Sequence, residues 1–100
     1  MTLTLTDHGR TLEVTTGSVL TVRLPENPGT GYRWTMETAA GLEPAGDRFE
    51  GAGGVGSTGT RELQFRASRV GSFDLRMKHW REWEGEGSVD RRFAVKIRVT

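Results

Sequence analysis

Arg92-Phe93-Ala94-Val95-Lys96-Ile97-Arg98-Val99, close to the end of the 100-residue chain, shows the clearest periodicity in the sequence. Every second residue from Phe93 onward is apolar, and most of the residues between them are basic. Successive side chains of an extended strand point to opposite faces, so this alternation gives one apolar and one polar face. The stretch is therefore predicted to be a strand of an antiparallel sheet with one face in water.

The same alternation recurs along the rest of the chain. Apolar side chains follow each other at two-residue spacing at Leu3/Leu5, Leu12/Val14, Leu20/Val22/Leu24, Tyr32/Trp34/Met36, Leu63/Phe65/Ala67 and Phe73/Leu75/Met77. A short helix is expected only over residues 36–42, because no longer window has apolar residues at helical spacing. About seven or eight short strands separated by turn residues predict an all-β fold, an immunoglobulin-like antiparallel β-sandwich. A closed barrel would show the same alternation, so the sandwich is the favoured of two architectures.

Length and composition favour one small domain, residues 1–100, with no room for a second. The chain has 14 Lys and Arg, 13 Asp and Glu, a formal net charge of +1 and no cysteine. Binding to nucleic acid or to a membrane surface is not expected from so balanced a charge. The N-terminus lacks the basic and apolar regions of a signal peptide, which predicts a cytoplasmic protein or the mature form of an exported one. We expect a monomer.

Catalysis and metal binding find little support in the sequence. The only histidines, His8 and His79, stand in distant segments, whereas a zinc site takes three or four His, Cys or carboxylate ligands. Glu82, Glu84 and Glu86 lie in a segment that contains glycines and are expected to be solvated. We therefore expect no enzyme activity, no catalytic residue, no metal site and no cofactor.

Three segments between the expected strands contain more than turn residues. The first is Asn27-Pro28-Gly29-Thr30-Gly31, called here the proline loop. Asn, Pro and Gly in this order suit a type II turn. The alternative is a contact role, because Pro28 fixes one φ angle and the glycines leave the backbone bare. Such a stiff loop can approach the groove of another protein and lose little entropy on docking.

The second segment, residues 51–59, is called the glycine loop because it has five glycines in nine residues. A flexible hairpin tip and a contact loop that lies flat against a partner are both compatible with this composition. A phosphate-binding loop is disfavoured, because no Lys-Ser/Thr pair follows and no helix N-terminus is predicted.

The third segment, residues 78–88, is called the tryptophan segment and is expected to be a loop between two strands. Trp80 and Trp83 stand among charged residues, so they either fold back onto the sandwich or lie exposed. Exposed tryptophans are frequent in protein interfaces, and two of them could also stack on sugars. Alternate connections of a sandwich emerge at the same end, so the three segments can form a single binding edge.

Together, the three segments resemble the binding loops of the chagasin-like inhibitors of papain-family cysteine proteases. Asn27-Pro28-Gly29-Thr30-Gly31-Tyr32-x-Trp34 is similar to the family's Asn-Pro-Thr-Thr-Gly-[Tyr/Phe]-x-Trp, Gly51-x-Gly53-Gly54 to its Gly-x-Gly-Gly, and Lys78-His79-Trp80 to its Arg-Pro-Trp. The resemblance covers essentially the whole chain. It implies an immunoglobulin-like sandwich that inhibits clan CA proteases reversibly and noncovalently, with all three loops in the active-site cleft.

The resemblance also assigns the site residues. It implies that the proline loop contacts the protease through Asn27, Pro28, Gly29, Thr30 and Gly31, of which residues 28–31 form a central wedge near the catalytic Cys and His. It also implies that the backbone of Gly51, Gly53 and Gly54 packs along the cleft and that Lys78, His79 and Trp80 lie at the opposite rim. Trp83, a second tryptophan in the same charged segment, is an additional contact candidate. Two residues depart from the family motif, since Gly29 replaces a Thr and His79 replaces a Pro. A carbohydrate-binding module that uses Trp80 and Trp83, or an adhesion or assembly domain without inhibitory activity, are the alternatives.

Overall fold

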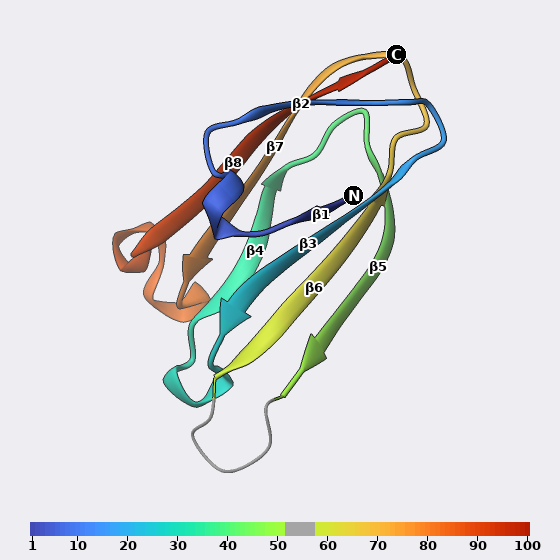
Figure 1. Cartoon of the computed structure of the whole chain (residues 1–100). Helices are drawn as coiled ribbons and strands as arrows, with labels where there is room; N and C mark the ends of the chain where they lie inside the picture. The colour runs from blue at the N-terminus through green and yellow to red at the C-terminus, as the bar shows by residue number, and fades with distance from the viewer. Residues whose placement is uncertain (52–57) are drawn as a thin grey trace.

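The computed structural model describes residues 1–51 and 58–100 as a sandwich of two four-stranded sheets (Figure 1). One sheet has the strand order β1-β3-β6-β5 and the other the order β2-β8-β7-β4. The strands are β1 Thr2–Leu3, β2 Thr11–Val14, β3 Val19–Glu26, β4 Arg33–Thr38, β5 Glu43–Glu50, β6 Gly59–Arg66, β7 Gly71–Trp80 and β8 Arg91–Val99. Short 3-10 helices lie in the connections: η1 Leu5–Asp7, η2 Pro28–Thr30, η3 Glu82–Glu84 and η4 Glu86–Ser88. None of the helices in the described residues is long and apolar enough to cross a membrane.

The core lies between the two sheets and is built from the alternating residues. In β8, the apolar side chains at positions 93, 95, 97 and 99 are buried, whereas Lys96 and Arg98 are exposed. The apolar residues of β3 at positions 20, 22 and 24 face them from the other sheet and are fully buried. The two-residue period therefore places one apolar face of each sheet toward the other, and the predicted all-β sandwich is confirmed.

The sheets are mixed rather than purely antiparallel. Strand β1 pairs with β3 in parallel, and β2 pairs with β8 in parallel, while the other pairs are antiparallel. Between β1 and β2 the chain leaves one sheet and enters the other, and Leu5, expected in a strand, lies in η1 and packs against the core. The η1 turn is closed by the backbone N–H of Thr4, which donates to Asp7 Oδ2 at 2.9 Å. Strand direction depends on this crossing, which side-chain alternation does not record.

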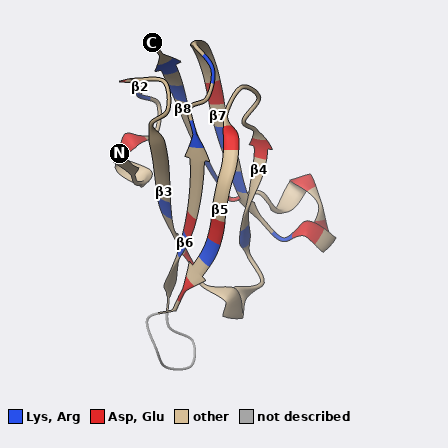
Figure 2. Cartoon of the chain, turned by 90° about the vertical axis from the view of Figure 1, so that its right-hand side faces the viewer, with Lys and Arg blue, Asp and Glu red and all other residues tan. Residues whose placement is uncertain are grey.

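Two other elements differ from the expectation. Strand β5 was not indicated by the sequence, because all of its residues are exposed and no apolar alternation marks it. Figure 2 shows charged residues along this strand. It is an edge strand, a position that tolerates Pro44. The short helix expected over residues 36–42 is wrong, since β4 continues to Thr38 and a turn follows. Gly41 adopts a φ of +89° in that turn, and a Cβ there would lie 2.0 Å from the ring of Phe73.

The strand register brings the proline loop, the end of β7 and the strand ends on either side of residues 52–57 to one end of the molecule (Figure 1). Glu26 at the end of β3 pairs with Gly59 at the start of β6, so the proline loop begins beside the end of the glycine loop. Arg33 at the start of β4 pairs with Trp80 at the end of β7, so the proline loop ends beside the tryptophan segment. These two pairings position the candidate site.

Candidate functional site

The proline loop is a single turn of 3-10 helix capped by Asn27. Asn27 Oδ1 accepts a hydrogen bond from the Gly29 N–H at 3.0 Å, and the backbone carbonyl of Asn27 accepts one from the Thr30 N–H at 3.1 Å. Pro28 occupies the first helical position, where its missing N–H costs nothing. Gly31 ends the turn with a φ of +80°. The loop is therefore this capped turn rather than a type II turn, and Pro28, Gly29 and Thr30 are exposed at its tip.

Beneath this tip lies a buried polar network that joins the two ends of the loop. Glu26, which is 3% exposed, accepts a hydrogen bond from the Trp34 N–H at 2.9 Å through Oε2. The Trp34 indole N–H in turn donates to the Pro25 carbonyl at 2.8 Å. Arg61 Nη1 lies 3.4 Å from Glu26 Oε1, which compensates the buried carboxylate. A hydrogen bond to Asp47 is the main reason that the pKa of Arg61 is raised, so this cation stays charged.

The sequence interpretation missed Glu26, although the sequence contains a signal for it. Glu26 continues the two-residue series of Leu20, Val22 and Leu24, so it lies on the inward face of β3. A carboxylate at a core position needs hydrogen-bonding partners, and the backbone N–H after the loop provides one.

The expected loop at residues 78–80 is the end of strand β7. The prediction was wrong because β7 remains paired on both sides almost to its end, with Trp80 opposite Arg33 and His79 opposite Arg91. The connection to β8 therefore covers residues 81–90. His79 continues the two-residue series of inward side chains at Phe73, Leu75 and Met77. This signal was missed because residues 78–80 are charged or aromatic and resemble a loop.

Trp80 and Lys78 pack together on the outer face of the β7–β8 sheet. The Trp80 indole N–H donates to Thr35 Oγ1 at 3.0 Å, and the Lys78 ammonium lies 3.6 Å from the centre of one indole ring. Trp80 is half-buried by these contacts. It is thus the tryptophan that folds back onto the sandwich, and the ammonium covers part of the surface that a sugar would need.

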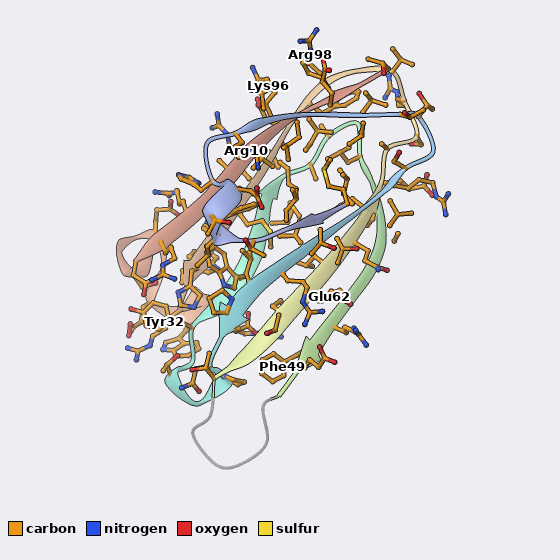
Figure 3. All side chains as sticks on the ribbon, viewed as in Figure 1. Arg10, Tyr32, Phe49, Glu62, Lys96 and Arg98 are labelled. Carbon is orange, nitrogen blue, oxygen red and sulfur yellow. The ribbon has the colours of Figure 1, made fainter. Side chains whose placement is uncertain are left out.

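His79 lies on the other face of β7, beneath the proline loop. Its ring stacks on Tyr32 at 5.0 Å between ring centres and tilts against Trp34 at the same distance. Its Nδ1 lies 2.7 Å from a carboxylate oxygen of Asp90. The Tyr32 side chain lies where η2 and the β7–β8 connection meet (Figure 3). His79 therefore supports the loop from below, with its side chain half-buried.

Trp83 is the exposed tryptophan of the site. In η3, its side chain is 71% exposed, yet its ring lies directly against Gly31. Of the predicted glycine residues, Gly51 is exposed after the end of β5, whereas Gly53 and Gly54 lie outside the described residues. The structure thus brings the proline loop, Trp83 and the end of β7 together. Gly51 directly follows β5, which ends at the same end of the sandwich.

Ion pairs fix the β7–β8 connection to the sheet. Glu86 in η4 accepts a hydrogen bond from Lys78 Nζ at 2.9 Å and another from Arg92. The hydrogen bond from Lys78 is the main reason that the pKa of Glu86 is lowered. Ser88 closes the connection by accepting the Arg81 N–H through Oγ at 3.0 Å. The connection is consequently a folded segment with its own contacts.

A groove of about 470 Å³ runs along the open edge of β4 beside this site. Trp80, Trp83 and Gly31 contribute to one side of it, and Met36 and Leu63 to its apolar floor. The convex proline loop and this groove therefore lie next to each other at the end of the sandwich.

Comparison with known proteins identifies the family. The model of the chagasin family of peptidase inhibitors, I42, matches residues 13–97, which is most of the chain. The chain belongs to the chagasin family. The resemblance seen in the loop motifs is confirmed, and because the family consists of peptidase inhibitors, the chain is not an enzyme.

Individual relatives of this chagasin-family chain cover nearly its full length. It is 25% identical to chagasin of Trypanosoma cruzi over 105 residues, which is 97% of this chain and 96% of chagasin. The crystal structure of a cysteine protease inhibitor from Entamoeba histolytica matches with a TM-score of 0.87 and 22% identity, covering 99% of this chain and 93% of that one. The structure of PbICP-C in complex with falcipain-2 matches with a TM-score of 0.71 and 12% identity, covering 100% and 90%. The two structural matches show that the fold is shared.

Proposed function

We propose that this protein is a reversible, noncovalent inhibitor of papain-like cysteine proteases of clan CA, and that the proline loop enters their active-site cleft. The observation that carries the proposal is the exposed, internally hydrogen-bonded tip at residues 28–30, which stands on a buried base. Membership of the chagasin family supports inhibition of a peptidase. The complex of the structural relative PbICP-C with falcipain-2 supports a protease as the partner.

The shape of the proline loop explains how it can block a protease without being cut. Proteases bind their substrates as extended chains, whereas this loop is a closed turn. The carbonyls of Asn27 and Pro28 already accept the N–H groups of Thr30 and Gly31, both at 3.1 Å. An extended path through the cleft would break these hydrogen bonds and the Asn27 cap. The tip therefore does not present the extended peptide bond that a protease cleaves.

The departure at Gly29 is compatible with this role. A Cβ at Gly29 would lie 3.2 Å from Asn27 Oδ1, which is the oxygen that caps the turn. The glycine therefore leaves the cap undisturbed, and the backbone still supplies the convex surface. A wedge made of backbone needs no particular side chain at this position.

Carbohydrate binding is less well supported by the site. Trp80 is half-buried and lies under the Lys78 ammonium, so Trp80 and Trp83 do not present two open rings for stacking. An adhesion role has no specific observation in its favour.

Titration of papain with the purified protein tests the proposal. We expect stoichiometric loss of peptidase activity that recovers on dilution, and an intact inhibitor by mass spectrometry after prolonged incubation. Trypsin, whose nucleophile is a serine in a different cleft, is the control and should keep its activity. Cleavage within residues 27–31 would show a substrate, and activity retained across a panel of papain-like enzymes would reject inhibition.

A further inference from the structure

The β7–β8 connection touches the proline loop through two side chains, Arg81 and Trp83, which stand outside the Lys78-His79-Trp80 motif. We propose that these two residues hold the proline loop in its binding conformation before any protease arrives. They are positioning residues of the inhibitor, and the inference rests on the proposed function for its effect on inhibition. Residues 81–84 are called the brace below.

Arg81 connects the brace to the C-terminal side of the proline loop. Its Nε donates a hydrogen bond to the Thr30 carbonyl at 3.0 Å, across 51 positions of sequence. Its guanidinium carbon lies 4.7 Å from the centre of the Tyr32 ring, a cation–π arrangement. Nη1 also donates to Glu84 at 3.1 Å, which fixes the direction of the planar group. One side chain therefore holds the last residue of η2 and the residue that precedes β4.

Trp83 contacts the loop at the residue between those two. A Cβ on Gly31 would lie 2.5 Å from the Trp83 ring, so the indole leaves no room for a side chain at this position. Gly31 also has a φ of +80°, which other residues rarely adopt. Glycine is thus favoured here for two reasons, its backbone conformation and the ring that lies against it. The ring keeps this place although it is 71% exposed and outside the core.

These contacts act on the part of the loop that its own base does not reach. The network around Glu26 fixes residues 25, 26 and 34, whereas the hydrogen bonds of the tip are local: they run to Asn27 and Pro28, and Thr30 Oγ1 accepts the Tyr32 N–H at 3.2 Å. Arg81 and Trp83 hold Thr30 and Gly31 from outside the loop. If the free loop adopts the competent conformation for only a fraction of the time, the apparent dissociation constant rises by the inverse of that fraction. The brace therefore strengthens inhibition by reducing the ordering that binding requires.

Amide hydrogen exchange in the free protein measures this ordering directly. We compare Arg81→Met and Trp83→Ala with Arg76→Met, which removes the same charge from an exposed position of the neighbouring strand β7. Exchange of the Gly29, Thr30 and Gly31 amides should become about tenfold faster in both brace variants, because the ordered population of the loop falls. The Arg76→Met variant should exchange as the wild type does.

Inhibition of papain and thermal unfolding complete the test. The brace variants should raise the inhibition constant by about tenfold, while the unfolding midpoint stays within roughly 2 °C of the wild type. Arg81→Lys, which keeps the charge but loses the planar group, should lie between Arg81→Met and the wild type. This order would not follow from a loss of charge alone.

Three results would overturn the proposal. Unchanged loop exchange in both variants would show that the brace does not order the loop, whatever the effect on papain. Weaker inhibition by Trp83→Ala with unchanged exchange would make Trp83 a direct contact instead. A large drop in the unfolding midpoint of Arg81→Met would assign Arg81 to the stability of the fold. If the wild type fails to inhibit papain, the proposed function fails, but the exchange experiment still decides whether the brace orders the loop.

Discussion

The base and the tip of the proline loop are built from adjacent residues but follow different physical rules. At the base, Glu26 and Trp34 are 3% and 4% exposed and every polar contact is internal to the sandwich. At the tip, Pro28, Gly29 and Thr30 are exposed and bonded within the loop and to Arg81. Burial makes the base a determinant of stability, and exposure leaves the tip available for contact with a partner. Variants of the two regions should therefore differ in what they damage.

The largest effect is expected for Trp34→Ala at the base. The change leaves a cavity in the core and removes the hydrogen bond to Pro25, so it should lower the free energy of unfolding by about 3–5 kcal/mol in chemical denaturation. Trp83→Ala makes the same chemical change beside the tip and should cost less than about 0.5 kcal/mol, since Trp83 is mostly exposed. Equal losses in the two variants would contradict the division between base and tip.

Glu26→Ala should be the next most damaging change. It leaves the Arg61 guanidinium and the Trp34 N–H without their buried partner, which should lower the free energy of unfolding by about 3 kcal/mol. Glu26→Gln retains an acceptor for the N–H and should cost less. The free energy of unfolding of Glu26→Gln, compared with that of the wild type in chemical denaturation, measures what the charge of Glu26 contributes to stability. Full tolerance of the alanine would mean that the base does not depend on this carboxylate.

Trp80→Ala is expected to separate binding from stability. The half-buried side chain has one hydrogen bond, to Thr35, so the stability loss should be about 1 kcal/mol. Trp80 is a predicted contact with the protease, so its loss should weaken papain binding by about 1–3 kcal/mol, as measured by the inhibition constant. Thr35→Val removes only the hydrogen bond to Trp80. It serves as the control for any change in the inhibition constant that comes from losing this hydrogen bond and not from losing the indole. If Trp80→Ala unfolds the domain, and its weaker binding is explained by that unfolding, Trp80 determines stability in the same way as the buried base of the loop.

Gly29→Thr, which restores the family residue, should have a small effect at the tip. The new Cβ lies close to Asn27 Oδ1, so the cap has to shift slightly, and the stability should fall by less than about 1 kcal/mol. Gly29→Ala places the same Cβ without the hydroxyl and is the matched control. Inhibition constants of the two variants show whether the threonine side chain contributes to binding. A stability loss as large as that of Glu26→Ala would show that the tip is packed more tightly than its exposure indicates.

The smallest expected effect is a pH dependence in the β7–β8 connection. The pKa of Glu86 is lowered by the Lys78 hydrogen bond, so the stabilising ion pair is present above the ordinary pKa of 4.5 and is lost as the pH falls through the lowered value. In the Glu86→Gln variant, the unfolding midpoint should not show the fall with decreasing pH that comes from protonation of Glu86. Its unfolding should otherwise resemble that of the wild type. Thermal unfolding of both proteins across the acidic range measures the difference. Parallel curves would show that the exposed pair contributes nothing.

Much of the fold was predictable because burial produces a period of two. That period located the core residues of β3, β7 and β8, and it placed Trp34 inside. It did not locate β5, whose residues are all exposed, because an edge strand held by backbone pairing needs no apolar side. It also did not record that β1 and β2 run parallel to their neighbours. Sheet direction depends on where the chain crosses between sheets, and no local pattern encodes that crossing.

The candidate site divides in a similar way. Local turn chemistry indicated a stiff turn at residues 27–31, and the structure has a capped turn there. The contact of Arg81 with Thr30 joins residues 51 positions apart, and only the pairing of β4 with β7 brings them together. The roles of Gly53 and Gly54 in protease contact stay predictions, as do those of the other loop residues.

Strand β5 has a consequence for the behaviour of the molecule at high concentration. An open sheet edge can recruit a strand from a second molecule, and regular, uncharged edges do so most readily. In β5 the pairing with β6 is interrupted between Pro44 and Gly46, Pro44 has no N–H to offer, and Asp47, Arg48 and Glu50 are charged. Each of these features discourages edge-to-edge assembly into fibres. The open edge of β5 can thus stay unpaired without a segment that covers it.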